Sequence, residues 1–482
     1  MRYQAVESPN TLQDPINASP RKPPHSTLSV DARLDALAPR LSRFYVQLLV
    51  LTGVSWAVLA AELVLLVFTR VLVANDLGMG TPVLEIFGAS IFMGAMAGGP
   101  IFGHVADRFG RRTALLIAMV FSLGGLAVLA RANVQYMLII GRVIVGIGLG
   151  GQLSSTLVLV QELSPRSMQN RVLSLLDAFT GAGGLVGVAL AYAVAPWLGW
   201  RTTYLVVCGI VVYTVVLRFT VPESPRWLAS VGRTEEAHGI IDKIERCHHV
   251  QPPSDEVQKE VLDFTSILES PSSSSAAAAK PSSLIKRVLP TAVLWVLWIA
   301  VTLSASALGI YVPTLISLNG YNLFGSWITV AVLSVAQILG SLAAAFVLGS
   351  REPRHALAGF AVLAASVSVL LSYVSWSRGL VITGSFLATA LLSGCWSCVF
   401  AYTPRHYKTA RRGRGVGYAV GVSRLAIVGG SYLYPHMFNV WILSVPALCW
   451  IFGSLLTVVS VGIVPRFGYQ SVSQEDGSDS SG

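Results

Sequence analysis

Charged side chains are scarce in this chain of 482 residues and make up only 12% of it. A typical soluble domain carries about 25% charged residues, so the composition excludes an ordinary water-soluble globular protein. Cysteine is also rare, and most of the five cysteines lie inside apolar runs. We therefore expect no framework of disulfide bonds.

Long apolar runs fill most of the sequence instead, and hydrophobic residues make up 53% of it. A run of about 20 apolar residues spans a bilayer as a helix, which satisfies its backbone polar groups internally. The sequence therefore predicts an all-α membrane protein. We expect twelve transmembrane helices, at residues 44–69, 83–105, 113–131, 135–160, 172–195, 203–221, 288–316, 324–348, 355–374, 379–403, 414–437 and 440–465.

Basic residues are distributed unevenly between these runs. One side of the predicted membrane carries only Arg70, Arg131, Arg201 and Arg378, and the other carries both tails and most basic turns. Because cytoplasmic loops are enriched in lysine and arginine, we expect both termini in the cytoplasm. Membrane topology thus accounts for the net charge of +10, and we expect no nucleic-acid partner. The N-terminal tail contains no apolar segment, so we expect no cleavable signal peptide.

Two sets of six spans suggest a duplicated transporter, in which the substrate binds near the membrane midplane between the halves. Residues 222–287 form a polar segment with short amphipathic stretches and a serine- and alanine-rich linker. The sequence predicts five parts. They are an N-terminal tail (1–43), a six-helix bundle (44–221), a cytoplasmic loop (222–287), a second six-helix bundle (288–465) and a C-terminal tail (466–482).

One acid and three arginines stand between the second and third predicted spans, in GHVADRFGRR at residues 103–112. Gly110 permits a tight turn, and Asp107 can meet a helix N-terminus, where the helix dipole favours an anion. Arg111 and Arg112 can meet carboxylates at neighbouring helix ends. We therefore expect these charges to hold one face of the bundle closed.

This stretch resembles the signature between spans two and three of the major facilitator superfamily. GRVIVGIGLGG, QELSPRSMQNR and VPESPRWL resemble three further motifs of its sugar-porter and organic-ion branch, in the right order and spacing. The resemblance implies a cytoplasmic gate, with Glu162 and Glu223 as expected partners of Arg111, Arg112 or Arg171. The full set of expected gate residues is Gly103, Asp107, Arg108, Gly110, Arg111, Arg112, Glu162, Arg171, Asp177, Glu223 and Arg226.

The finer pattern resembles the niacin, aromatic-acid and synaptic-vesicle-protein-like transporters. The second half departs from that pattern. Arg405 stands where the branch usually has an acid and Lys408 where it has a proline, and GSREPRHA is a reduced copy of the opening motif. These departures leave open an alternative function, a non-transporting receptor or vesicle protein on the same fold.

An acid deep within a predicted span is a functional candidate by default, and Glu62 is such an acid. The resemblance implies that Glu62 carries the coupling proton and pairs with Arg142 of the fourth span. A fixed structural ion pair between the two residues is the alternative interpretation.

Other polar groups in the spans are candidates for substrate binding. Arg424 is either an anchor for an anionic substrate or the partner of a carbonyl group. Asp177 is interpreted as a gate residue in preference to a substrate contact. Glutamines and aromatic residues can line a cavity, although they can equally join helices. These further candidates are Gln152, Gln337, Trp298, Tyr311, Trp396 and Tyr402.

The sequence thus favours a secondary active transporter for a small organic solute, with a carboxylate-bearing metabolite or vitamin preferred over a sugar. Proton coupling and alternating access are expected, and the absence of a P-loop disfavours ATP as the energy source. We expect no enzymatic activity, cofactor or metal, and a monomer in the lipid bilayer. The plasma membrane is favoured over an organelle or vesicle membrane.

Overall fold

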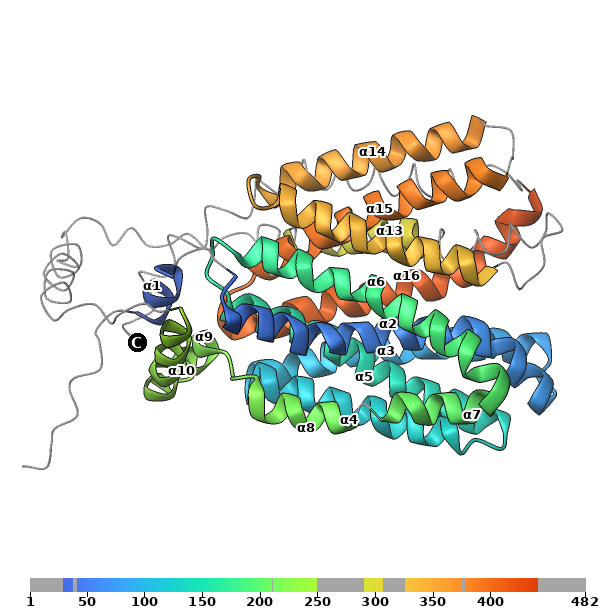
Figure 1. Cartoon of the computed structure of the whole chain (residues 1–482), viewed down its shortest axis with the longest axis horizontal. Coiled ribbons are helices and arrows are strands. Elements are labelled where there is room, and N and C mark those ends of the chain that lie inside the picture. The colour runs from blue at the N-terminus through green and yellow to red at the C-terminus, as the bar shows by residue number, and fades with distance from the viewer. Residues whose placement is uncertain are drawn as a thin grey trace, which may run out of the picture. The chain divides into compact units, whose positions relative to one another are not determined.

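The computed structural model describes residues 29–37, 41–209, 211–248, 290–306, 326–373 and 378–440. Contacts divide the chain into two units, and all the helices below belong to the unit that begins at Val30. In the described residues the regular structure is helical throughout (Figure 1). The predicted twelfth span, Tyr311 and most of the predicted linker region lie outside these residues.

The first half of the chain forms helices at the predicted positions of spans one to six. Positive φ angles at Gly78 and Gly110 end the second and third helices. The sixth predicted span consists of α7 and α8, with residue 210 between them outside the described part. The helices are α1 (Val30–Asp35), α2 (Arg43–Leu77), α3 (Thr81–Phe109), α4 (Arg111–Ala130), α5 (Gln135–Leu163), α6 (Gln169–Ala193), α7 (Ala195–Cys208) and α8 (Val211–Thr220).

Two short helices follow α8, as the amphipathic pattern of the sequence predicts. They are α9 (Pro225–Ser230) and α10 (Thr234–Cys247). The hydroxyl of Ser224 accepts a hydrogen bond from the backbone N–H of Trp227 and so caps α9. Apolar residues of α10 at helical spacing, Ala237 and Ile241, pack against Trp227 in a small separate core.

The second half of the chain is described in part. A helix at Pro290–Ser306 covers the beginning of the seventh predicted span. It is followed by α13 (Ser326–Val347), α14 (Pro353–Tyr373), α15 (Arg378–Tyr402), two turns of 3₁₀ helix (η2, Thr403–His406; η3, Thr409–Arg411) and α16 (Arg412–Val440). Helices therefore occupy eleven of the twelve predicted positions.

Within the described residues, seven helices are long and apolar enough to cross a membrane. Large apolar side chains are also exposed on several of them, including Val120, Val186 and Phe346. In water such a surface is costly, whereas hydrocarbon accommodates it. Both observations agree with a polytopic membrane protein.

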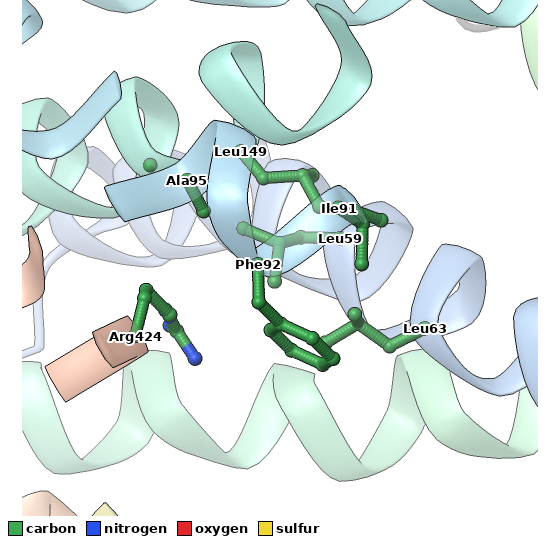
Figure 2. A pocket seen from close by; sticks show the side chains of 8 residues that line it. Leu59, Leu63, Ile91, Phe92, Ala95, Leu149 and Arg424 are labelled. Carbon is green, nitrogen blue, oxygen red and sulfur yellow. The ribbon is translucent and has the colours of Figure 1, made fainter. Parts of the chain in front are cut away.

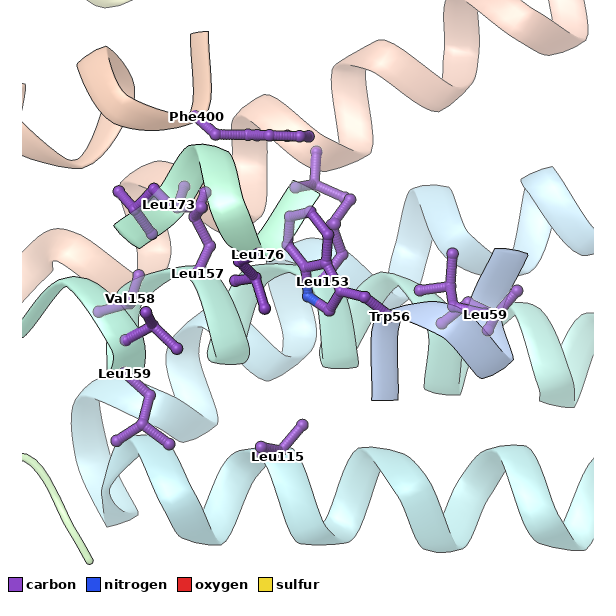
Figure 3. Packing of buried hydrophobic residues seen from close by; sticks show 14 of the residues in the cluster. Trp56, Leu59, Leu115, Leu153, Leu157, Val158, Leu159, Leu173, Leu176 and Phe400 are labelled. Atoms are coloured by element: carbon purple, nitrogen blue, oxygen red, sulfur yellow. The ribbon is translucent and has the colours of Figure 1, made fainter. Parts of the chain in front are cut away.

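The two halves of the chain pack against each other along two lines of contact. Helix α3 lies along both α5 and α16, and α6 lies along α2, α13 and α15. Figure 3 shows Trp56 of α2 next to Phe400 of α15, with leucines of α5 and α6 beside them. The ring centroids of Trp56 and Phe400 are 5.1 Å apart, so apolar packing also joins the halves.

One end of the bundle gathers the arginine-rich turns. The turn between α3 and α4, the turn between α5 and α6, helix α9 and the start of α16 meet there. We call this end, which carries Arg111, Arg166, Arg226 and Arg412, the basic end. It lies on the side that the sequence predicts to face the cytoplasm.

Candidate functional site

The turn at Gly110 places the start of α4 against the loop that follows α8. Gly110 has a φ of 104°, and a Cβ atom there would collide with the Glu223 carboxylate. Glu223 accepts hydrogen bonds from the backbone N–H groups of Arg111 (2.9 Å) and Arg112 (3.0 Å). Burial raises the pKa of Glu223, while the same backbone N–H groups act in the opposite direction. The hydrogen bonds described for Glu223 are therefore with the N-terminus of α4, and the charge of Arg111 adds an electrostatic interaction.

Arg111 and Glu162 form a fully buried ion pair at the basic end. Arg111 Nε lies 2.8 Å from Glu162 Oε2, and Nη2 lies 3.2 Å from Oε1. The hydroxyl of Ser224 also donates to Glu162, over 2.6 Å. Charged groups in such a site need partners, and here each has several.

The same pair reaches the second half of the chain. Arg412 Nη1, at the start of α16, lies 2.8 Å from Glu162 Oε1. Arg111 Nη2 donates to the carbonyl oxygen of Thr409 over 2.5 Å. Glu162 thus holds one arginine from each half of the chain.

Asp107 makes a further link between the halves at the N-terminus of α16. Its carboxylate accepts hydrogen bonds from the backbone N–H groups of Gly413 (2.9 Å) and Arg414 (3.0 Å). An anion at a helix N-terminus is stabilised by the unpaired N–H groups and the helix dipole. The sequence predicts this kind of contact for Asp107 but does not identify α16 as the helix.

Gly103 permits the close approach of α3 and α16 that Asp107 needs. A Cβ atom at Gly103 would lie 2.5 Å from the carbonyl oxygen of Gly413, which is shorter than any normal contact. Small residues at such crossings let two backbones touch in a membrane protein. Gly103 therefore acts here through packing.

The remaining expected gate residues lie apart from this cluster. Arg226 of α9 pairs with Asp31 (2.9 Å) and Asp35 (3.1 Å) of α1. Arg166, in the turn between α5 and α6, pairs with the same two acids. Arg171 is exposed and forms no ion pair with Glu162, and Arg108 is exposed with its guanidinium near the ring of Phe109.

Several contacts of the basic end are not predicted from the sequence. Arg412 belongs to a basic run that indicates topology, and nothing in that run identifies Glu162 as its partner. Asp31 and Asp35 are four residues apart and so share one face of α1. This spacing is the feature of the sequence that could have indicated a helix that binds the basic end. Arg33 of the same helix pairs with Glu245 of α10 over 2.7 Å.

Glu62 and Arg142 are both buried within the bundle, but they do not form the expected ion pair in this structure. Neither carboxyl oxygen of Glu62 has a hydrogen-bond partner. Arg142 donates from Nη2 to the hydroxyl of Tyr204, and its guanidinium lies over the rings of Tyr204 and Phe87. Arg142 is still near enough to Glu62 for an electrostatic interaction. A carboxyl group so placed can gain or lose a proton without breaking a hydrogen bond.

Asp177 of α6 is buried against three serines from the second half of the chain, which we call the hydroxyl cluster: Ser341 of α13 with Ser393 and Ser397 of α15. Ser341 and Ser397 donate to Asp177 Oδ2 over 2.9 and 2.8 Å. The two hydroxyls join α6 to α13 and α15, so Asp177 also links the halves. Its partners are neutral hydroxyl groups, unlike those of Asp107 and Glu162.

A cavity lies midway along the helices, between α2, α3, α5 and α16. The space in it that is open to a water-sized sphere is about 10 Å³, and Arg424 is the charged residue that lines it. The other lining residues are Leu59, Leu63, Ile91, Phe92, Ala95, Leu149 and Gly150. Figure 2 shows the Arg424 side chain extending from α16 toward Phe92. No hydrogen bond or ion pair joins Arg424 to another residue in the described part of the chain.

The glutamine and aromatic candidates lie in the packing between helices. Gln152 donates to Ser122 of α4 and accepts from Ser55 of α2, so it joins three helices. Trp298 is fully buried and donates to Thr403 over 2.9 Å. Trp396 stacks on Phe400, Tyr402 packs on His406, and the backbone oxygen of Gln337 accepts from serines. None of these residues lines the cavity that holds Arg424.

Comparisons with known proteins agree on one family. The family model of the Major Facilitator Superfamily matches residues 46–431. Among solved structures, the proton:xylose symporter XylE bound to 6-bromo-6-deoxy-D-glucose is similar with a TM-score of 0.71 and 18% identity, covering 88% of this chain and 96% of that one. At this identity the likeness shows the fold.

Among curated proteins, the niacin transporter NiaP of Acinetobacter baylyi is 29% identical, over 82% of this chain and 88% of its own length. The benzoate transport protein of the same species is 25% identical, over 75% and 78%. The synaptic vesicle 2-related protein of Xenopus laevis is 24% identical, over 88% and 77%. The predicted fold and the predicted resemblance to these groups are therefore confirmed.

Proposed function

Since this chain belongs to the Major Facilitator Superfamily, an integral membrane family of transporters, we propose that it is a proton-coupled secondary transporter of a small aromatic carboxylate. The proposal rests on Arg424, which has no hydrogen-bond or ion-pair partner in the described part of the chain. A lone guanidinium in an apolar cavity is unfavourable until an anion joins it. A carboxylate substrate supplies that anion, in a bidentate geometry that suits arginine.

The lining of the cavity also suits the rest of such a substrate. The space open to a water-sized sphere is about 10 Å³, which is room for about one water molecule, so the two halves must move apart before a substrate enters. Phe92 and the aliphatic side chains offer apolar contacts to a ring, as Figure 2 shows. Niacin and benzoate, named for two of the relatives, are both aromatic acids.

The position of the cavity fits alternating access. Arg424 belongs to the second half of the chain, and the other lining residues belong to the first. The bound carboxylate therefore touches both halves and favours a state in which they are close. Transport to the cytoplasm then requires the contacts at the basic end to break, namely Arg412 with Glu162 and Asp107 with the N-terminus of α16.

Glu62 is the proposed carrier of the coupling proton. It lies between Leu59 and Leu63 in sequence, and both of these residues line the cavity. Because Glu62 has no hydrogen-bond partner, protonation there removes a buried charge without breaking a contact. Uptake of an acid with a proton then moves less net charge across the membrane.

Two alternative functions remain distinguishable. A sugar needs several polar groups for its hydroxyls, and Arg424 is the polar side chain of the cavity wall. A non-transporting vesicle protein is favoured by the altered motifs of the second half and by the similarity to a synaptic vesicle 2-related protein.

The basic-residue asymmetry supports cytoplasmic termini, and we favour the plasma membrane.

The test is uptake of labelled nicotinate and benzoate into vesicles that contain the purified protein, with and without a proton gradient. We expect accumulation against a concentration gradient with the proton gradient present, and none for neutral nicotinamide or glucose. Arg424→Ala abolishes accumulation, while Arg131→Ala, at an exposed arginine of the opposite end, leaves it unchanged. Accumulation of glucose would favour the sugar alternative, and absence of any uptake would favour the non-transporting one.

A further inference from the structure

The hydroxyl cluster around Asp177 contains more short contacts than its protons can fill. Five oxygen–oxygen distances of hydrogen-bond length join its serines to one another, to Asp177 and to the carbonyl oxygen of Gln337. They are Ser341 to Asp177 (2.9 Å), Ser397 to Asp177 (2.8 Å), Ser341 to Ser393 (2.7 Å), Ser341 to the Gln337 carbonyl (3.0 Å) and Ser393 to the same carbonyl (2.9 Å). All the oxygens involved are in the range where a proton normally lies between them.

Each serine hydroxyl donates one proton, whereas an ionised carboxylate and a carbonyl only accept. The three serines therefore fill three of the five contacts when Asp177 is charged. The two remaining contacts then place lone pairs against each other in a buried site. A fourth proton on Asp177 fills one of them, because the carboxyl group then donates to Ser341 and releases the Ser341 proton for Ser393 or Gln337.

From this count we infer that Asp177 is a second protonation site of the protein, separate from Glu62, and that its proton completes a hydrogen-bond chain from α6 through α13 to α15. The ligand is a proton from water: an O–H bond forms on the carboxylate, and no other bond breaks. The chain runs from Asp177 to Ser341, then to Ser393, and ends at the Gln337 carbonyl. It is complete only while α6 is in contact with both helices of the second half.

The ionisable groups described on the neighbouring helices do not compete with Asp177 for this proton. Helices α2, α5, α7, α13 and α15 pack on α6. Within its described range α13 has no ionisable side chain, and α15 presents the buried thiols of Cys395 and Cys398, of which Cys398 interacts with Asp177 electrostatically.

Several charged groups of the other three helices engage described partners elsewhere. Glu162 pairs with Arg111 and Arg412, and Arg142 bonds to Tyr204. Arg201 of α7 pairs with Asp76 of α2. Glu62 is the unpaired acid of α2, and it lies on the cavity side of that helix. The nearest stabilising groups for Asp177 are therefore hydroxyls, including that of Thr180 on its own helix.

Infrared difference spectroscopy of the purified full chain in lipid measures this proton directly, because a protonated carboxylic acid has its own C=O stretching band. We expect a band that appears on acidification in the native protein and is lost in Asp177→Asn. The matched control Asp76→Asn, at an exposed acid, keeps the band. Ser397→Ala, in which Asp177 is retained, shifts the band because Oδ2 of the acid loses a hydrogen bond. This variant keeps the test valid if Asp177→Asn does not fold.

Two results overturn the inference. In the first, Asp177→Asn shows the same carboxylic acid bands as the native protein, and Ser397→Ala shifts none of them. In the second, the band responds at constant pH to the exchange of Na⁺ for choline, which means that a metal cation occupies the cluster. Glu62→Gln should remove a different band. The test of Asp177 is therefore separate from the test of Glu62 in the proposed function.

Discussion

Charged groups at the basic end and charged groups midway along the helices differ in how they are paired. At the basic end, Glu162 contacts Arg111, Arg412 and Ser224, and Asp107 receives two backbone N–H groups of α16. Midway along the helices, Glu62 has no hydrogen-bond partner and Arg424 has no anion. Paired charges fix one arrangement of the two halves, whereas unpaired buried charges gain by binding something.

This difference separates two roles: charged groups that join the halves, and charged groups that can bind a substrate or a proton. Asp107 and Arg111 of GHVADRFGRR hold the halves together at one end with Glu162, and each of the three has partners in both halves. The groups deeper in the bundle are the ones left available for a carboxylate and a proton. Substitutions in the two regions should therefore have effects of different kinds, and the following predictions are ordered from the largest expected effect to the smallest.

Glu62→Gln should abolish accumulation of substrate against a gradient, because glutamine cannot release a proton. Exchange of labelled for unlabelled substrate should survive, since exchange needs no proton release. The protein should also remain folded, because Glu62 has no hydrogen bond to lose. Uptake and exchange are measured in the same vesicles. Retained accumulation with native pH dependence would exclude Glu62 from coupling.

Glu162→Gln should destabilise the protein by about 3–5 kcal/mol, the usual cost of removing one partner of a buried ion pair. The change leaves Arg111 and Arg412 without their shared carboxylate. The control is Glu236→Gln, which breaks an exposed pair with Arg233 and should cost no more than about 1 kcal/mol. Unfolding of both variants is followed in detergent. Equal stability of the two would refute the distinction between paired and exposed charges.

Asp107→Asn should weaken the contact between α3 and α16 by about 1 kcal/mol, the difference between a charged and a neutral hydrogen-bond acceptor. The closed basic end then loses about fivefold in population relative to the open one. We expect the maximal rate of transport to change more than the substrate concentration at half-maximal rate. An unchanged rate at normal expression would show that this contact does not limit opening.

Asp76→Asn should have the smallest effect, because its pair with Arg201 is exposed at the opposite end of the bundle. Hydrogen bonds from Arg201 and Trp200 lower the pKa of Asp76 in the folded protein. The stability that Asp76 contributes is therefore present above its unfolded pKa of about 3.9 and is lost as pH falls through the lower folded value. Unfolding of the native protein and the variant should differ slightly at neutral pH and converge in acid.

The sequence predicts the fold well because apolar length, basic asymmetry and four spaced motifs all indicate the same architecture. It also predicts Arg111, Arg112 or Arg171 as partners of Glu162 and Glu223, since all of them belong to recognisable motifs, and the structure pairs Arg111 with Glu162. It does not predict that Glu223 meets backbone N–H groups, because a helix N-terminus offers no side-chain signal. The serines around Asp177 come from segments far apart in the chain, and small polar residues in apolar runs show no pattern that identifies partners.

Binding of nicotinate to the purified protein tests the central claim most directly, with Arg424→Ala compared against Arg412→Ala. We predict that Arg424→Ala weakens binding by at least about tenfold, because a charge-assisted hydrogen bond contributes about 1.5–3 kcal/mol. Arg424→Lys should bind with intermediate affinity, since it keeps the charge and loses the bidentate geometry. Arg412→Ala removes a paired arginine of the basic end that does not line the cavity, and should change the affinity less than Arg424→Ala does. Native affinity in Arg424→Ala, with loss of binding in Arg412→Ala, would contradict the account.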